Sequence, residues 1–348
     1  MNFKREELEK FRSFKGPLID VRSPNEYYKG HMPNSINIPL FDNDERAIIG
    51  TYYKKYGREK AIQEGLIIFE RKIDSLLNKL FNYINIQKIG NLNLDINKQQ
   101  IRVYCARGGM RSMSISWLLE KYNLDTISLI GGYKKYRNWT LKHFSKNWNI
   151  VVIGGKTGTG KTKLLNFLDK QNFQVIDLEG LACHRGSTFG GLGMKKQPSN
   201  EHFENTIAEK LSSFKIEEYI FVEAESANIG KCKIPHEFFN QMKNSKRIEI
   251  IKSFSNRLDE LINTYSIFSK KELEDSVLRI KKRLGPQRTK IAIESIKQEK
   301  WDIVCQSVLE YYDKCYEYEK IGKDNITLLD LTDLKYDKHT LDLIKNIL

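Results

Sequence analysis

The sequence lacks long apolar runs and paired cysteines, and each absence narrows the class of protein. No stretch of about 18 consecutive apolar residues occurs, so no membrane-spanning helix and no membrane partner are expected. The opening residues, MNFKREELEK, are charged and do not resemble a secretory signal. The five cysteines include no C-x-x-C pair, which argues against a disulfide framework and a zinc knuckle. We therefore expect a protein of the reducing cytoplasm.

Acidic residues are too few to balance the basic ones. The 348 residues include 58 Lys and Arg against 44 Asp and Glu, a formal net charge of +14. A surplus of this size indicates a polyanionic partner, with nucleic acid first. A proteome rich in Lys, Asn and Ile is the alternative explanation.

The length predicts two domains, at roughly 100–200 residues for each. Strands and helices alternate in both halves, which favours an α/β fold class with mainly parallel sheets flanked by helices. We place one domain at residues 1–140 and the other at 148–348, with a polar stretch at 141–149 between them. The second domain has a helical, basic part at about 256–320.

A complete phosphate-binding motif opens the second domain. The segment GKTGTGKT matches G-x-x-x-x-G-K-[ST] and lies between an apolar strand and a helix. Gly155, Gly158 and Gly160 let backbone N–H groups converge on phosphate oxygens. Lys161 is expected to reach the terminal phosphate, and the Thr162 hydroxyl can bind Mg²⁺. The motif predicts a P-loop.

Carboxylates follow two neighbouring apolar strands of the same domain. Asp177 and Glu179 follow FQVI, and Glu223 and Glu225 follow YIFV. A P-loop enzyme needs such an acid for Mg²⁺ or for acid–base chemistry, and the alternative is a solvated strand end. The motif alone leaves open whether the ligand is a nucleotide such as ATP or another diphosphate ester.

The segment VYCARGGMRS holds a candidate nucleophile in the first domain. Cys105 ends a predicted strand, and a helix begins at about Arg111. Arg107, Arg111 and the helix N-terminus favour the thiolate over the thiol, and a thiolate is a nucleophile at neutral pH. Gly108 and Gly109 are expected to supply the backbone conformations of an anion cradle. The spacing Cys-x₅-Arg fits both a phosphatase and a rhodanese-type sulfurtransferase.

The chain resembles a known family over nearly its whole length. LIDVRSPNEYYKGHMPNSINIPL, VYCARGGMRS and LIGGYKKYRNW resemble the rhodanese domain in order and spacing. A rhodanese domain followed by a P-loop resembles the bacterial tRNA 2-selenouridine synthases. The segments that carry this resemblance are NDERAIIGTYYKKYG, CARGGMRS, GGKTGTGKT, DLEGLACHRGSTFG, VEAES and RLGPQR.

The resemblance implies a specific reaction on tRNA. The family replaces the sulfur of a wobble 2-thiouridine by selenium from selenophosphate, which its own synthetase supplies. The reaction is thought to pass through an S-geranyl intermediate made from geranyl diphosphate. The resemblance places the selenium carrier on Cys105, as a selenyl-sulfide, and implies no tightly bound cofactor or metal. Lys161 could then neutralise a departing diphosphate.

A basic segment, RIKKRLGPQR, is the candidate contact with tRNA or a diphosphate. Its basic residues include Lys281, Lys282, Arg283 and Arg288 around a Gly-Pro turn. A solvated helix face is the alternative. Three other functions stay open at this point: a Cys-x₅-Arg phosphatase with a nucleotide-binding domain, a persulfide sulfurtransferase, and a non-enzymatic P-loop regulator.

Overall fold

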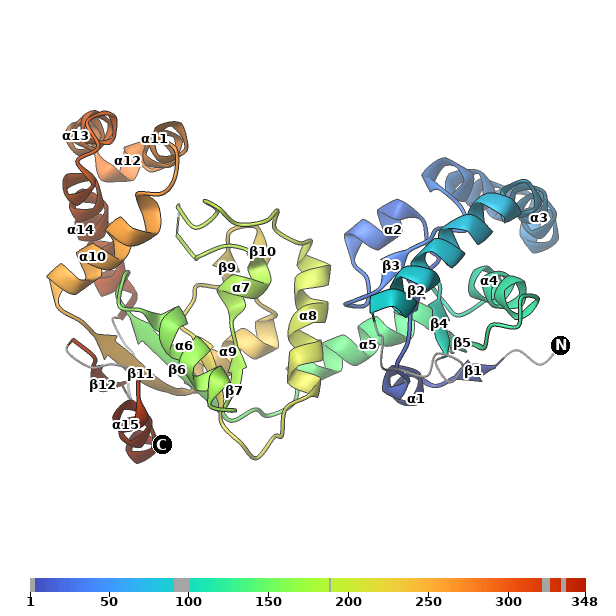
Figure 1. Ribbon diagram of the computed structural model, residues 1–348, viewed down its shortest axis with the longest axis horizontal. Helices are drawn as coiled ribbons and strands as arrows, with labels where there is room; N and C mark the ends of the chain where they lie inside the picture. Colours follow the sequence, from blue (N-terminus) through green and yellow to red (C-terminus); the bar gives the residue numbers. More distant parts are fainter. Residues whose placement is uncertain (1–3, 91–99, 188, 321–325, 333–335) are drawn as a thin grey trace. The chain divides into compact units, whose positions relative to one another are not determined.

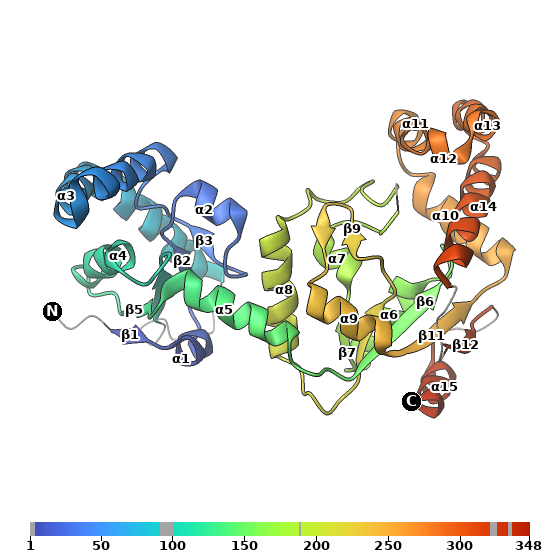
Figure 2. The ribbon, with the colours of Figure 1, turned by 180° about the vertical axis from the view of Figure 1, so that it is seen from behind.

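The computed structural model describes residues 4–90, 100–187, 189–320, 326–332 and 336–348. The chain forms two compact units. The first consists of Met1–His143 with Ser199–Glu209, and the second of Phe144–Pro198 with Lys210–Leu348. Figure 1 labels the elements of both units, and Figure 2 shows them from behind.

The first unit is built on a parallel sheet of five strands in the order β1-β5-β4-β2-β3. Its central strands are buried and mainly apolar, as expected for parallel strands covered on both faces, but they also bury Asp20, Thr126 and Ser128. The elements of the unit are β1 Arg5–Glu6, α1 Leu8–Ser13, β2 Leu18–Asp20, α2 Pro24–Lys29, β3 Ile36–Asn37, α3 Asn43–Gly90, β4 Ile101–Tyr104, α4 Met110–Glu120, β5 Thr126–Leu129 and α5 Gly132–Phe144.

Alternate residues of the strands point to opposite faces of this sheet. Ile19 and Val103 pack with buried residues of α3 and α4 in one cluster. Leu18 and Tyr104, their neighbours in the chain, pack with residues of α1 and α5 in another. Because the period of a strand is two, this alternation produces three layers with helices on both faces. The expected α/β class is confirmed.

Two local sequence features determine where helices α2 and α3 begin or bend. Ser23 begins α2 with a capping box to Glu26, and Pro24 occupies the first helical turn. The segment Asn43–Gly90 forms α3 with a kink at Gly57. Gly57 has φ 82° and ψ −178°, a conformation outside the helical region, so it divides α3 into two helical stretches.

The second unit has a five-stranded parallel sheet in the order β12-β11-β6-β8-β7 and an antiparallel pair, β9 and β10. Its strands are β6 Ile150–Gly155, β7 Gln174–Ile176, β8 Ile220–Glu223, β9 Asn228–Ile229, β10 Cys232–Lys233, β11 Lys246–Ile251 and β12 Ile326–Asp330. Its helices are α6 Lys161–Lys170, α7 Leu178–Ala182, α9 His236–Asn244, α10 Phe254–Tyr265, α11 Lys270–Arg279, α12 Lys281–Leu284, α13 Pro286–Lys297, α14 Trp301–Lys320 and α15 Lys338–Ile347.

Two main apolar clusters hold the second unit together. One joins the central strands to α6 and α15, and includes Val151, Leu165 and Ile344. The other joins α11, α13 and α14 around Val277 and Ile296, which makes the expected C-terminal helical part a small core of its own. Within the described residues, no helix combines the length and apolar character that crossing a bilayer requires.

Helix α8, Asn200–Ser212, belongs mainly to the first unit, although the sequence places residues 148–348 in the second domain. Asn205 is fully buried and explains this placement. Its side-chain amide donates to the backbone oxygen of His31 and to the Tyr133 hydroxyl, both at 2.8 Å. Its oxygen accepts from Arg137. Such long-range partners leave no local signal in the sequence.

Asn205→Ala should destabilise the protein by about 2–4 kcal/mol, since it leaves a cavity and several buried polar partners unsatisfied. Urea unfolding of the full chain measures this loss. The matched control is Asn200→Ala on the exposed side of the same helix, with an expected change within about 0.5 kcal/mol. Equal stability of the two variants would contradict the role given to Asn205.

Candidate functional site

Cys105 lies directly after β4 and before α4, where the amide of Gly109 points at its sulfur. The N–H of Gly109 donates to Cys105 Sγ at 3.3 Å, and the Ser112 hydroxyl lies 3.3 Å from the same sulfur. Cys105 is only 3% exposed. These contacts hold the sulfur beside the N-terminus of α4, a position that suits a nucleophile.

The Gly-Gly pair after β5 clamps the cysteine loop. The N–H of Tyr133 donates to the backbone oxygen of Cys105 at 2.8 Å. Gly108 has φ 63°, and a Cβ there would lie 2.2 Å from the backbone oxygen of Leu129. A Cβ on Gly132 would lie 2.3 Å from the oxygen of Cys105. Glycine is therefore required at both positions, which explains why LIGGY accompanies the cysteine loop.

Gly109 differs from the expectation that both loop glycines adopt unusual backbone conformations. Its φ is −108°, outside the left-handed region, and a Cβ there would meet no atom within 4 Å. Its contribution is the N–H that points at Cys105 Sγ.

The two arginines of the loop differ in their surroundings. Arg111 donates to both carboxylate oxygens of Glu26, at 2.6 and 3.2 Å. Burial alone would raise the pKa of Glu26, but the Arg111 guanidinium outweighs burial and lowers that pKa to about 2. Arg107 is exposed and makes no hydrogen bond or ion pair with any described residue. Arg107 is thus the arginine available to an incoming anion.

A cavity of about 1170 Å³ opens over Cys105. Helix α3 supplies most of one wall, and the cysteine loop supplies the other. The basic side chains that line it are Arg46, Lys54, Arg58, Arg107 and Arg111, against the single acid Glu26. The large apolar side chains that line it are Leu40, Phe41, Ile49, Tyr53, Ile62, Leu66, Phe69 and Met110.

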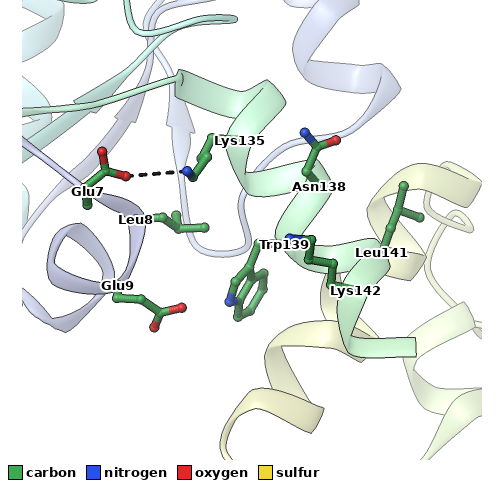
Figure 3. Close-up of a pocket in the computed structure, with 8 residues that line it drawn as sticks. All are labelled: Glu7, Leu8, Glu9, Lys135, Asn138, Trp139, Leu141 and Lys142. Carbon is green, nitrogen blue, oxygen red and sulfur yellow. Dashed lines mark ion pairs between the residues drawn. The ribbon is translucent and has the colours of Figure 1, made fainter. Parts of the chain in front are cut away.

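A second hollow of the first unit lies between α1 and α5 and measures about 590 Å³. Figure 3 shows Lys135 directed toward Glu7, an ion pair of 3.6 Å, with Trp139 and Leu141 further along α5. Its lining contains Glu7 and Glu9 beside two lysines and no cysteine. This hollow therefore lacks the nucleophile and the cationic surplus of the cavity at Cys105.

The P-loop connects β6 to α6 as the sequence predicts. Gly155, Gly158 and Gly160 have φ values of 146°, 81° and 85°, which permit the tight loop. Lys161 Nζ donates to the backbone oxygen of Gly155 at 2.9 Å, so the ammonium lies over the loop. The glycine-rich loop and the N-terminus of α6 form an arrangement that suits a phosphate group.

Distant residues hold the P-loop from two sides. The N–H of Gly155 donates to the Tyr316 hydroxyl at 2.8 Å, and Tyr316 also bonds Arg247 and the buried Glu249. On the other side, Arg257 Nε donates to the backbone oxygen of Thr157 at 2.9 Å. In the sequence, Tyr316 belongs to the tyrosine-rich segment EYYDKCYEYEK. The spacing of its tyrosines is equally typical of a core helix, so it does not predict a contact with the P-loop.

The expected carboxylates gather beside the P-loop. Glu223 Oε1 accepts the N–H of Glu179 at 2.9 Å, and the Thr162 hydroxyl lies 3.5 Å from Glu179 Oε2. Burial raises the pKa of Glu223 well above its usual range, and Asp177 and Glu179 raise it further. Burial also raises the pKa of Glu179, against the opposing charge of Lys161. The carboxyl groups therefore do not ionise independently of one another.

The remaining carboxylates have different roles in the geometry. Asp177 begins α7 by accepting the N–H of Gly180 at 2.7 Å, so it caps a helix. Glu225 lies beside Gly186, whose Cβ would be 2.5 Å from Glu225 Oε2. Glu179 is the carboxylate nearest to the Thr162 hydroxyl in the hydrogen bonds of the described residues.

Lys252 is a further cation that sequence reasoning did not identify. It follows β11, and its Nζ would lie 3.4 Å from a Cβ on Gly160. Burial lowers the pKa of Lys252, although nearby Glu260 opposes this shift. The P-loop thus has a second ammonium beside it, and the apolar strand RIEIIK supplies no motif that would have shown it.

The basic segment of the sequence forms the turn between α11 and α13. Lys281, Lys282 and Arg283 of α12 are exposed, and Gly285 after them has φ 89°. Arg288 lies 3.6 Å from Glu310 in a partly exposed ion pair. Three exposed cations therefore present a compact basic surface, and Arg288 is partly neutralised.

The pair of Glu26 and Arg111 should make stability depend on acid pH. The folded-state pKa of Glu26 is about 2 against a usual 4.5. Its contribution to the free energy of unfolding is therefore complete above about pH 4.5 and is lost as the pH falls toward about 2. Glu26→Gln should flatten that fall in urea unfolding, while Glu9→Gln at an exposed position should keep it. An unchanged slope in Glu26→Gln would refute the pairing.

Both units of the chain are similar to known proteins. A rhodanese-like domain model matches residues 4–139. Two proteins described as tRNA 2-selenouridine synthase, from Nitrosomonas eutropha and Nitrosomonas europaea, are each 36% identical over 76% and 72% of this chain. These alignments cover 67% and 63% of the two relatives, so the match spans about two thirds of their length. A relative of the same description from Sulfurovum is 32% identical over 87% of this chain and 88% of its own length.

The second unit matches a model that is specific to one family. The model is described as the tRNA 2-selenouridine synthase AAA domain, and it matches residues 148–332, more than half of the chain. The matched segment contains the P-loop, the carboxylates beside it and the helical part with α12. Together with the rhodanese-like domain and the relatives, this match shows that the chain belongs to the tRNA 2-selenouridine synthase family.

Proposed function

We propose that this chain is a tRNA-modifying enzyme that converts wobble 2-thiouridine into 2-selenouridine. The observation that carries the proposal is the presence, on one chain of this family, of a cradled thiol and a P-loop. A net charge of +14 and the exposed cations of α12 suit a tRNA substrate. The cytoplasm, where tRNA is found, is the proposed location.

In this proposal, the P-loop binds geranyl diphosphate. In this step the sulfur of 2-thiouridine attacks the first carbon of the geranyl group. A C–S bond forms, the C–O bond breaks, diphosphate leaves with the electron pair, and N3 of the base loses its proton to water. Lys161 lies over the loop, where an ammonium stabilises the charge that develops on the leaving diphosphate.

The proposed reaction consumes no nucleotide, and on this ground we assign the P-loop to a diphosphate ester other than ATP. Apolar and aromatic side chains of α10, α11 and α14 lie next to the loop at Thr157, but they enclose only about 20 Å³, roughly the space of one water molecule, and do not by themselves select a prenyl donor. The residues around this space are Thr157, Phe189, Leu261, Tyr265, Leu273, Trp301, Val304, Cys305, Val308 and Tyr312.

Mg²⁺ fits the same site as a partner of the diphosphate. The hydroxyl of Thr162 and the carboxylate of Glu179 would hold it, with diphosphate oxygens and water as the other ligands that Mg²⁺ prefers. When bound, the ion would supply positive charge at the diphosphate oxygens. No tightly bound metal or cofactor is part of the proposal.

In this proposal, selenation takes place at Cys105. The selenium donor is selenophosphate, which selenophosphate synthetase supplies. The thiolate attacks selenium, an S–Se bond forms, and the Se–P bond breaks with its electron pair leaving on phosphorus as phosphite. The terminal selenium of the Cys105 selenyl-sulfide then attacks C2 of the S-geranyl nucleoside, and geranylthiolate leaves. A dithiol reductant finally cleaves the Se–S bond, is oxidised to a disulfide, and restores Cys105.

A phosphatase is the weaker alternative on this geometry. A Cys-x₅-Arg phosphatase uses its arginine to clamp phosphate, but here both oxygens of Glu26 accept hydrogen bonds from Arg111. A persulfide sulfurtransferase would use the same cradle, and product analysis of the modified nucleoside separates it from a selenotransferase.

Lys161→Ala should reduce formation of S-geranyl-2-thiouridine by at least about a hundredfold, because the leaving diphosphate loses its main cation. Mass spectrometry of anticodon-stem RNA incubated with geranyl diphosphate measures this. Lys163→Ala is the matched control, since Lys163 lies on the same helix and pairs with Glu260. Full geranyl transfer by Lys161→Ala would contradict the assignment of the P-loop.

Cys105→Ala should abolish 2-selenouridine while S-geranyl-2-thiouridine accumulates, because only the second step uses the thiol. Mass spectrometry of the RNA shows both nucleosides, and phosphorus NMR of the wild-type reaction should show phosphite. Selenation by Cys105→Ala would remove Cys105 as the selenium carrier. Phosphate in place of phosphite would refute the selenyl-sulfide and point to direct attack by selenophosphate at C2.

A further inference from the structure

The cavity over Cys105 contains more apolar surface than an anion needs. Tyr53, Leu66 and Met110 line it and are 59%, 53% and 45% exposed. Below them lie the buried Phe41 and Phe69. Large apolar side chains gathered in a concave surface favour an apolar ligand, because water covers them poorly.

The same cavity has a cationic rim. Lys54, Arg58 and Arg107 are exposed and make no ion pair or hydrogen bond with any described residue. They are therefore available to phosphates, whereas Arg111 is paired with Glu26. The volume of about 1170 Å³ exceeds the roughly 300–1,000 Å³ of most small-molecule pockets. One occupant must supply both an apolar group and negative charge next to a nucleophile.

We propose that this cavity is the subsite for the prenyl group of S-geranyl-2-thiouridine in tRNA. The apolar face of α3, with Tyr53, Ile62 and Leu66, packs against the geranyl chain. Lys54, Arg58 and Arg107 bind the phosphates of the same stretch of RNA. This inference rests on the proposed function and adds to it the residues that select the alkylated substrate for the second step.

Such a subsite gives the prenyl group a purpose beyond activating the sulfur. Each methylene that becomes buried strengthens binding about fourfold. The alkylated nucleotide therefore binds beside Cys105 more tightly than the unmodified 2-thiouridine. Cleavage of the C2–S bond separates the geranyl chain from the RNA. The RNA then loses the additional affinity that the geranyl chain supplied, and the selenated product dissociates.

The test compares two short anticodon RNAs, one with S-geranyl-2-thiouridine and one with S-methyl-2-thiouridine. Wild-type protein should bind the geranyl RNA on the order of a hundredfold more tightly, by fluorescence anisotropy, which is the effect of about three fully buried methylenes in a partly open cavity. Leu66→Gln and Tyr53→Gln should weaken geranyl binding about tenfold and leave methyl binding unchanged. Arg58→Gln should weaken both RNAs equally. Leu141→Gln is the control, since Leu141 is equally exposed (50%) in the other hollow.

The outcomes separate the subsite from the function. In one outcome, wild-type protein selenates the geranyl RNA, and Leu66→Gln and Tyr53→Gln selenate it with unchanged KM and affinity. This result would refute the prenyl subsite and leave the proposed function intact. If wild-type protein neither prefers nor selenates the geranyl RNA, the proposed function fails as well. A raised KM for geranyl RNA in the α3 variants alone supports the subsite.

Discussion

The hydrogen bond from Gly109 N–H to Cys105 Sγ is the interaction on which the account of the first unit depends. It exists because Gly108 can adopt φ 63° and because Gly132 lets the loop lie against the end of β5. A side chain at either glycine would push the loop away from Leu129 or Cys105. The sulfur is thereby held at the base of a cavity whose walls come from α3, so the reactive atom and the shape of its surroundings are set by the same backbone.

The second unit applies the same principle to phosphate. Backbone amides form the cradle, and distant side chains fix it: Tyr316 at Gly155, and Arg257 at Thr157. The carboxylates beside it are crowded enough that burial raises the pKa of Glu179 and Glu223. A loop held this firmly, with Lys161 above it, suits a bound phosphate group.

Local motifs could be predicted from the sequence, and long-range pairs could not. The P-loop follows from a few adjacent residues and forms between β6 and α6 as expected, and the capping box of α2 is equally local. The ion pair of Arg111 with Glu26 joins residues 85 positions apart, and Tyr316 reaches Gly155 across 161 positions. Helix α8 enters the first unit through the partners of Asn205. Each of these depends on tertiary packing, for which a single sequence carries no signal.

The central claim is that selenation acts on an alkylated sulfur at Cys105. The most direct test gives the full chain ready-made S-geranyl-2-thiouridine RNA and selenophosphate, with no geranyl diphosphate present. The account predicts 2-selenouridine and one geranylthiol released for each nucleoside converted. Absence of 2-selenouridine under these conditions, or its formation without release of geranylthiol, would contradict the account.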